Sequence, residues 1–146
     1  MQIITTRFGA RIIQPEDILL FPHGIVAFEK CRHWVILSDA EVQAVAWLQS
    51  ITRPEIALPV VSPRRFAPDY RVRISRQELA ALDLLNSDQA YVLSIIGIDR
   101  GLLTMNLKAP VIINLDRHLG RQVVTMDDQP LQHVLSQSSA LLRKSA

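Results

Sequence analysis

The chain has 146 residues, of which 49% are hydrophobic and 21% are charged. This balance is typical of a folded globular protein and excludes an intrinsically disordered chain. The single cysteine, Cys31, excludes a disulfide within the chain and any zinc or iron–sulfur site built from several cysteines. The length suits one domain whose core is large enough to fold without a disulfide or a metal.

Net charge and hydropathy give no indication of a nucleic-acid-binding, secreted or membrane-spanning protein. The formal net charge is only +2 at pH 7, which is too small to indicate nucleic-acid binding without a localised basic patch. The N-terminal residues lack the basic and apolar regions of a signal peptide, and no segment has the ~20 consecutive apolar residues of a membrane span. We therefore expect a soluble, cytoplasmic protein that does not enter a membrane.

Most of the chain consists of short apolar, β-branched runs separated by prolines and glycines, a pattern typical of strands joined by tight turns. Gly9 lies between the first two runs and suits a hairpin turn with positive φ. Strands so numerous, without long helices between them, favour a sandwich or a barrel over a doubly wound α/β fold. The expected strands cover residues 2–6, 10–13, 18–21, 34–37, 45–48, 56–61, 70–74, 91–98, 103–107, 111–115 and 122–126.

Two helices are expected. Ser75 and Glu78 form a capping-box pattern, in which each side chain accepts a hydrogen bond from the other residue's backbone N–H. This pattern predicts a short helix from Arg76 to about Leu85 that lies on the sheet. Apolar residues at helical spacing after Pro130 predict an amphipathic C-terminal helix, weakened in its middle by serines. We thus divide the chain into a domain over residues 1–128 and a C-terminal helical or disordered extension over residues 129–146.

No arrangement of catalytic or metal-binding residues stands out. Cys31 and His33 lie two positions apart, but no nucleophile-elbow glycines, orienting group or oxyanion hole accompany them. The four histidines show none of the spacings of a metal site, and the five glycines lie too far apart for a phosphate-binding loop. We therefore expect no enzyme activity, no catalytic residue, no metal and no cofactor.

Five arginines within thirteen residues make the most pronounced charge feature of the sequence. A strand from Tyr70 to Ile74 would place Arg71 and Arg73 on its solvent-facing side and the apolar residues on the other. Two interpretations stay open: an ordinary solvated strand face, or an anion-binding stripe for an acidic partner or an RNA backbone. The five arginines are Arg64, Arg65, Arg71, Arg73 and Arg76.

Four further residues have expected places in the structure. Trp34 and Trp47 lie in apolar runs and should be buried, each with an acceptor for its indole N–H. Asn106 and Asn114 flank a turn at Pro110, and both should hydrogen-bond to local backbone. A binding role for Asn106 stays open as an alternative.

Six motifs, in order, resemble the flagellar assembly factor FliW family over residues 1–126. The block TMNLKAPVIIN, from Thr104 to Asn114, is the most specific and is similar to the family's TxNLxAPIxIN pattern. The segment FPHGI, from Phe21 to Ile25, and the FE pair that follows match a second signature, in which Ala27 stands at a position that is commonly Gly. The other motifs are IITTRFG at 3–9, WLQS at 47–50, PDY at 68–70 and GRQVV at 120–124.

This resemblance implies a mainly β fold: a small, antiparallel, barrel-like single domain with one short internal helix, here followed by the C-terminal helical tail. It also implies a binding protein and not an enzyme. Members of the family bind and antagonise CsrA, a dimeric RNA-binding translational repressor, and they bind flagellin in competition with it. The level of flagellin is thereby coupled to flagellin translation.

Four exposed positions beside the motifs or on the arginine-rich segment are our candidates for contacting these protein partners, and no direct nucleic-acid binding is expected. The alternative is a direct RNA-binding module that uses the arginine-rich strand face. The candidate residues are Arg71, Arg73, Asn106 and Lys108.

Overall fold

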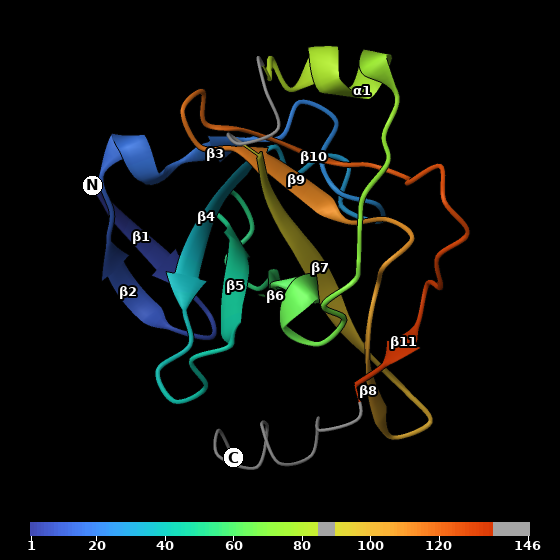
Figure 1. Ribbon diagram of the computed structural model, residues 1–146. Helices are drawn as coiled ribbons and strands as arrows, with labels where there is room; N and C mark the ends of the chain where they lie inside the picture. Colours follow the sequence, from blue (N-terminus) through green and yellow to red (C-terminus); the bar gives the residue numbers. More distant parts are fainter. Residues whose placement is uncertain (85–89, 136–146) are drawn as a thin grey trace.

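The computed structural model describes residues 1–84 and 90–135, and most of its regular structure is β (Figure 1). This confirms the expected mainly β, single-domain fold with few helices. The strands are β1 (Gln2–Thr5), β2 (Gly9–Ile12), β3 (Leu19–Leu20), β4 (His33–Ser38), β5 (Val45–Ser50), β6 (Ala57–Val61), β7 (Ala90–Asp99), β8 (Leu102–Met105), β9 (Val111–Asn114), β10 (Leu119–Gln122) and β11 (His133–Val134). The helices are the 3-10 turns η1 (Pro15–Asp17) and η2 (Pro63–Arg65) and the α-helix α1 (Arg76–Ala81).

Seven strands form a closed circuit of hydrogen-bonded pairs. From β7 the pairing runs through β6, β5, β4, β3, β10 and β9 and returns to β7. Within this circuit β3 and β10 pair in parallel, with Leu20 opposite Leu119, and the other pairs are antiparallel. β8 and β11 continue the sheet from the C-terminal half of β7, and β1 and β2 form a separate hairpin whose turn places Gly9 at a φ of 69°.

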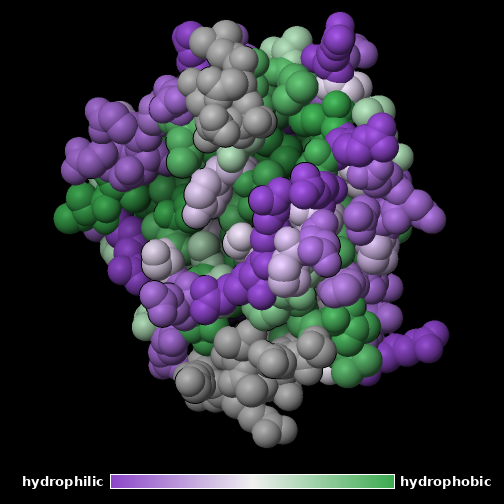
Figure 2. Space-filling view, viewed as in Figure 1, coloured by the Kyte–Doolittle hydropathy of each residue, from purple (hydrophilic) through white to green (hydrophobic). Residues whose placement is uncertain are grey.

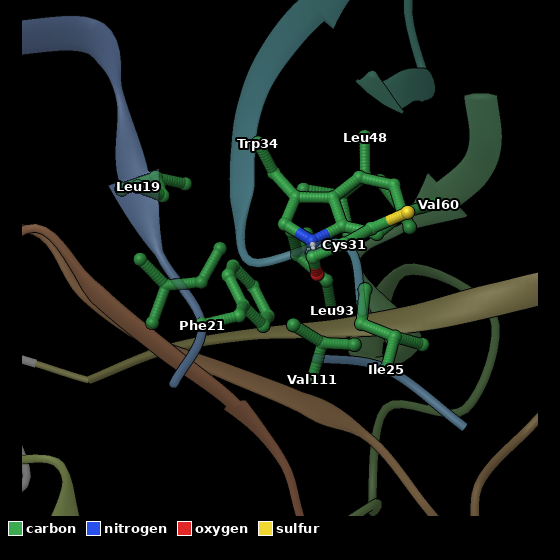
Figure 3. Packing of buried hydrophobic residues seen from close by; sticks show 10 residues of the cluster. Leu19, Phe21, Ile25, Cys31, Trp34, Leu48, Val60, Leu93 and Val111 are labelled. Carbon is green, nitrogen blue, oxygen red and sulfur yellow. Dashed lines mark hydrogen bonds between the residues drawn. The ribbon is translucent and has the colours of Figure 1, made fainter. Parts of the chain in front are cut away.

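The main core fills the space that the circuit encloses (Figure 3). Phe21 and Trp34 are fully buried at its centre, with their ring centroids 6.3 Å apart in an edge-to-face arrangement. The indole N–H of Trp34 donates to the carbonyl oxygen of Cys31 over 2.8 Å, so this polar group keeps a partner in the core. β10 contributes Gly120, where a Cβ would lie 2.3 Å from the ring of Phe21. A side chain at that position would therefore overlap the core.

A second apolar cluster packs on the outer side of the same strands. Because side chains alternate along a strand, Val60 of β6 faces the enclosed core while Val61 belongs to the outer cluster. Tyr70 and Leu135 cover this cluster and are each 4% exposed. The phenol of Tyr70 donates to the carbonyl oxygen of Leu107 over 2.6 Å, which anchors the segment after η2 to the loop between β8 and β9.

Three sequence predictions of secondary structure need correction. Residues 70–74 form no strand, because Arg73 bonds to residues 125–126 partly through the hydroxyl of Thr125. Their exposure still alternates: Tyr70 is buried, Val72 and Ile74 are half-buried, and the two arginines between them are exposed. The strand predicted over 122–126 lies earlier in the chain, at β10. After Pro130 the chain forms the strand β11 against β8 where a helix was expected. The remainder of that predicted helix lies outside the described residues. The division of the chain after residue 128 stays a prediction.

The predicted internal helix is present as α1, but it ends at Ala81, short of the predicted Leu85, and Asp83 just beyond it has a φ of 55°. Ser75 caps α1 by accepting a hydrogen bond from the N–H of Glu78 over 3.2 Å. The carboxylate of Glu78 instead pairs with the guanidinium of Arg121 on β10, so α1 is tied to the strand circuit. The last residue of the predicted helix, Leu85, lies outside the described residues.

Candidate partner-binding surface

The arginine-rich segment lies extended against the chain that follows β10. Arg71 and Arg73 are both exposed, as predicted. The backbone N–H of Arg73 donates to the hydroxyl of Thr125 over 3.1 Å, and its carbonyl oxygen accepts from the N–H of Met126 over 2.7 Å. The guanidinium of Arg73 also forms an ion pair with Asp127 at 3.1 Å. The structure therefore fixes the backbone of this segment while its charged ends reach solvent.

The other two candidate residues, Asn106 and Lys108, build the turn that precedes β9. The side-chain oxygen of Asn106 accepts a hydrogen bond from the N–H of Ala109 over 2.8 Å, which is the local backbone contact predicted for it. The ammonium group of Lys108 donates to the carbonyl oxygens of Thr125 and Asp127 over 3.1 and 2.7 Å. The structure thus brings Lys108 and Arg73 together around residues 125–127, with the polar end of each already bonded within the chain.

The cysteine and histidine weighed as a catalytic pair do not form one. Cys31 is 2% exposed and lies in the main core, whereas His33 is exposed to solvent. Over residues 1–84 and 90–135, no group of three or more His, Cys, Asp or Glu side chains is placed to hold a metal ion. A search of the same residues finds no helix long and apolar enough to cross a membrane.

Gln122 connects two of the sequence motifs. Its side-chain oxygen accepts a hydrogen bond from the N–H of Val26 over 2.9 Å, and its side-chain nitrogen donates to the carbonyl oxygen of Ala109 over 3.1 Å. One side chain thereby joins the turn after FPHGI to the turn at Ala109–Pro110. These hydrogen bonds therefore hold the two turns in place relative to β10.

A turn in the FPHGI…FE segment explains why glycine is common at the position that Ala27 occupies in this chain. The N–H of Phe28 donates to the carbonyl oxygen of Ile25 over 2.6 Å, which closes a four-residue turn. The third residue of this turn is Ala27, whose φ is 76°. A positive φ at the third position favours glycine, since a side chain there is strained. The alanine is consequently a strained substitute at an exposed position.

A groove of about 420 Å³ lies on the outer side of the sheet, and we call it the outer groove. It opens where β7 separates from β6: these two strands pair only at Val60–Val61, and from Ile96 onward β7 pairs with β8 on its other edge. At its rim Ile98 is 75% exposed. On the face of the molecule that Figure 2 shows, hydrophobic side chains lie at the surface among hydrophilic ones. The residues lining it include Val42, Val45, Trp47, Pro59, Ile96 and Leu103.

Asp39 supplies the one acidic side chain that lines the outer groove, as far as the structure describes the chain. Its carboxylate accepts hydrogen bonds from the indole N–H of Trp47 over 3.0 Å and from the backbone N–H of Val42 over 2.8 Å. These bonds, the one from Trp47 above all, hold the pKa of Asp39 below its ordinary value. The guanidinium of Arg7 lies 4.1 Å from the centre of the Trp47 ring. The outer groove therefore combines an apolar floor with a carboxylate that stays ionised at neutral pH.

Sequence reasoning missed the outer groove because it expected both tryptophans in the core. Trp34 is fully buried as predicted, but Trp47 is only partly buried and lines the outer groove. The available signal was the run Ile95, Ile96 and Ile98 in β7, which puts apolar side chains on both faces of one strand. Such a strand needs a second apolar surface besides the enclosed core.

Comparisons with known proteins agree on one family. The family model described as "FliW protein" matches residues 2–135. The flagellar assembly factor FliW of Bdellovibrio bacteriovorus is 41% identical over 130 residues, which cover 88% of this chain and 74% of that protein. The flagellar assembly factor FliW of Pseudothermotoga lettingae is 32% identical over 151 residues, which cover 98% of this chain and 96% of that protein.

A solved structure agrees with these sequence matches. A crystal structure of the flagellar assembly factor FliW matches with a TM-score of 0.85 and 26% identity, and the match covers 92% of this chain and 96% of that one. The similarity therefore extends through the strand circuit, β8 and β11, and is not confined to the motifs. By fold, by motif order and by sequence identity, this chain belongs to the FliW family of flagellar assembly factors.

Proposed function

We propose that this chain is a cytoplasmic, non-enzymatic binding protein that antagonises the translational regulator CsrA and also binds flagellin. The observation that carries the proposal is family membership across residues 2–135. Free flagellin would occupy the factor and leave CsrA able to repress flagellin translation; export of flagellin would release the factor to capture CsrA.

Such a switch needs no chemical step. It requires that the two partners exclude one another, or that each weakens the binding of the other, and that their affinities differ. A rigid strand circuit suits this task, since a preformed surface loses little conformational freedom when it binds.

The proposal is tested by titration calorimetry of the purified chain with CsrA and with flagellin separately, and then with CsrA after saturation with flagellin. We expect a complex at micromolar concentration or below with each partner, and weaker CsrA binding to the flagellin-loaded chain. No complex with either partner would refute the function, and unchanged CsrA binding to the loaded chain would refute the switch.

We further propose that Arg71, Arg73, Asn106 and Lys108 mark a partner contact. Arg71→Ala is the sharpest variant, because the guanidinium is exposed and its removal disturbs no ion pair among those described. We expect about tenfold weaker partner binding, mostly through slower association, with unchanged stability. Arg32→Ala, a second exposed arginine outside this segment, is the matched control. Equal effects of the two variants would count against a specific contact.

Direct RNA binding through the arginine-rich segment is the alternative function. Arg65, Arg71 and Arg76 are exposed, whereas the guanidinium groups of Arg64 and Arg73 already have partners within the chain. A steep loss of RNA affinity with rising salt, absent from the Arg71→Ala/Arg73→Ala variant, would favour this alternative. No RNA binding at low salt would exclude it.

A further inference from the structure

We propose that residues 136–146 of this same chain bind in the outer groove through Leu141 and Leu142. The outer groove has an apolar floor and an exposed rim at Ile98, and the described residues leave it open. The occupant is inferred from where the described chain ends, how many residues follow, and which side chains they carry.

The described chain ends at the edge of the outer groove. β11 runs antiparallel to β8, with His133 opposite Met105 and Val134 opposite Thr104. The next residue, Leu135, is 4% exposed and donates its N–H to the carbonyl oxygen of Leu103 over 3.0 Å. Leu103 itself lines the outer groove. The chain therefore leaves its last described position beside the groove, in the direction that leads along β8 away from Met105.

The eleven residues after Leu135 are enough to occupy the groove. Leu142 lies seven positions further on, which corresponds to about 23 Å of extended chain or about 10 Å of helix. Since Leu103 is both a lining residue and the hydrogen-bond partner of Leu135, no long connection has to be crossed. The first four residues of the segment, SQSS, are polar and can serve as the link.

The side chains of the segment complement those of the groove. Ala140, Leu141 and Leu142 form its apolar part, and Arg143 and Lys144 follow directly. The apolar part matches the floor, and the two cations match the carboxylate of Asp39 at the groove. Because the segment is tethered, its effective concentration at the groove is far above that of a separate peptide, so modest affinity is sufficient.

The test is paramagnetic relaxation enhancement on the full chain carrying Ser145→Cys with a nitroxide label. Cys31, which is 2% exposed, stays unlabelled in the folded protein. We expect strong broadening of the amide signals of Ile98 and Leu103, and none in α1, which lies at the opposite end of the molecule from β8 (Figure 1). The variant Leu141→Ser/Leu142→Ser should lose the broadening, and the matched control Ser138→Ala/Ser139→Ala should keep it.

Each other outcome overturns the proposal. Absence of broadening at the groove, or broadening that persists in the double leucine variant, would show that the segment does not bind there through these residues. Isotope-labelled chain without nitroxide, mixed with nitroxide-labelled chain, reports binding between copies. Broadening of that mixed sample equal to that of the labelled chain alone would assign the groove to a second copy. The experiment contains neither CsrA nor flagellin, so its result is independent of the proposed function.

Discussion

Replacing Ala27 by glycine should stabilise the protein. An L-residue in the left-handed region costs about 1–2 kcal/mol, and Ala27 lies in that region with a φ of 76°. Glycine removes this strain but loses about 0.5–1 kcal/mol more backbone entropy on folding than alanine does. The Ala27 methyl group is exposed, so its removal sacrifices no buried surface. The net gain in the free energy of unfolding is therefore about 0–1.5 kcal/mol.

The assay is equilibrium unfolding in urea, in which a higher midpoint at an unchanged slope reports higher stability. The matched control is Ala10→Gly in β2, another exposed alanine but one whose φ is not positive. The control should be destabilised by about 0.5–1 kcal/mol, since it pays the entropic penalty without any relief of strain. A midpoint for Ala27→Gly that falls as far as that of the control would refute the reasoning.

Three further predictions concern the packing at Gly120, the loss of stability at acidic pH through Asp39, and the hydrogen bond and alkaline titration of Tyr70. Gly120→Ala should lower stability by about 1–3 kcal/mol, since its Cβ would lie 2.3 Å from the ring of Phe21; urea unfolding measures this, and an unchanged midpoint contradicts it. The pKa of Asp39 is lowered on folding, so its contribution to stability is present above the unfolded pKa and is lost as the pH falls through the folded pKa. The free energy of unfolding of Asp39→Asn should therefore fall less steeply with acidic pH than that of the unsubstituted protein. Equal pH dependence of the two free energies would count against this. Tyr70→Phe should lower stability by about 1–2 kcal/mol, because it removes the hydrogen bond to Leu107. Burial raises the pKa of Tyr70 from 10.0 to about 12, so the unfolded chain loses the phenol proton at a lower pH than the folded protein does. The unsubstituted protein should therefore lose stability as the pH rises from 10.0 to about 12. Tyr70→Phe should not show this loss when unfolding is measured over the same pH range.

Hydrophobic periodicity was sufficient to find most strands, but not the bonds that hold the rest of the chain. In residues 70–74 the alternation identified Tyr70 as buried and Arg71 and Arg73 as exposed. It could not reveal that the partner of Arg73 is the side chain of Thr125, because a hydroxyl that replaces a ladder bond leaves no trace in hydropathy. A different reason applies to β11: it is only two residues long, too short to show an alternation, so its residues were predicted as the start of a helix.

The candidate site was predictable only in part. Asn106 bonds to the local backbone as its place beside a turn indicated. The outer groove depends on β6 separating from β7 after the pair of Val60 with Ile95, while β7 continues beside β8 on its other edge. Where two strands separate is a property of the whole sheet, and no local pattern around Ile95 encodes it.

The circuit of strands also constrains the order of events during synthesis. Its parallel pair joins Leu20 to Leu119, which lie near opposite ends of the described sequence. The N-terminus of a nascent chain leaves the ribosome first. β3 therefore cannot pair with β10 until almost the whole domain has been synthesised. Pairings between such distant residues slow folding, since a large loop must be ordered before they form. A chain that ends at residue 118 would accordingly contain β1 to β9 but lack β10, the strand that joins β3 to β9, so the circuit could not close.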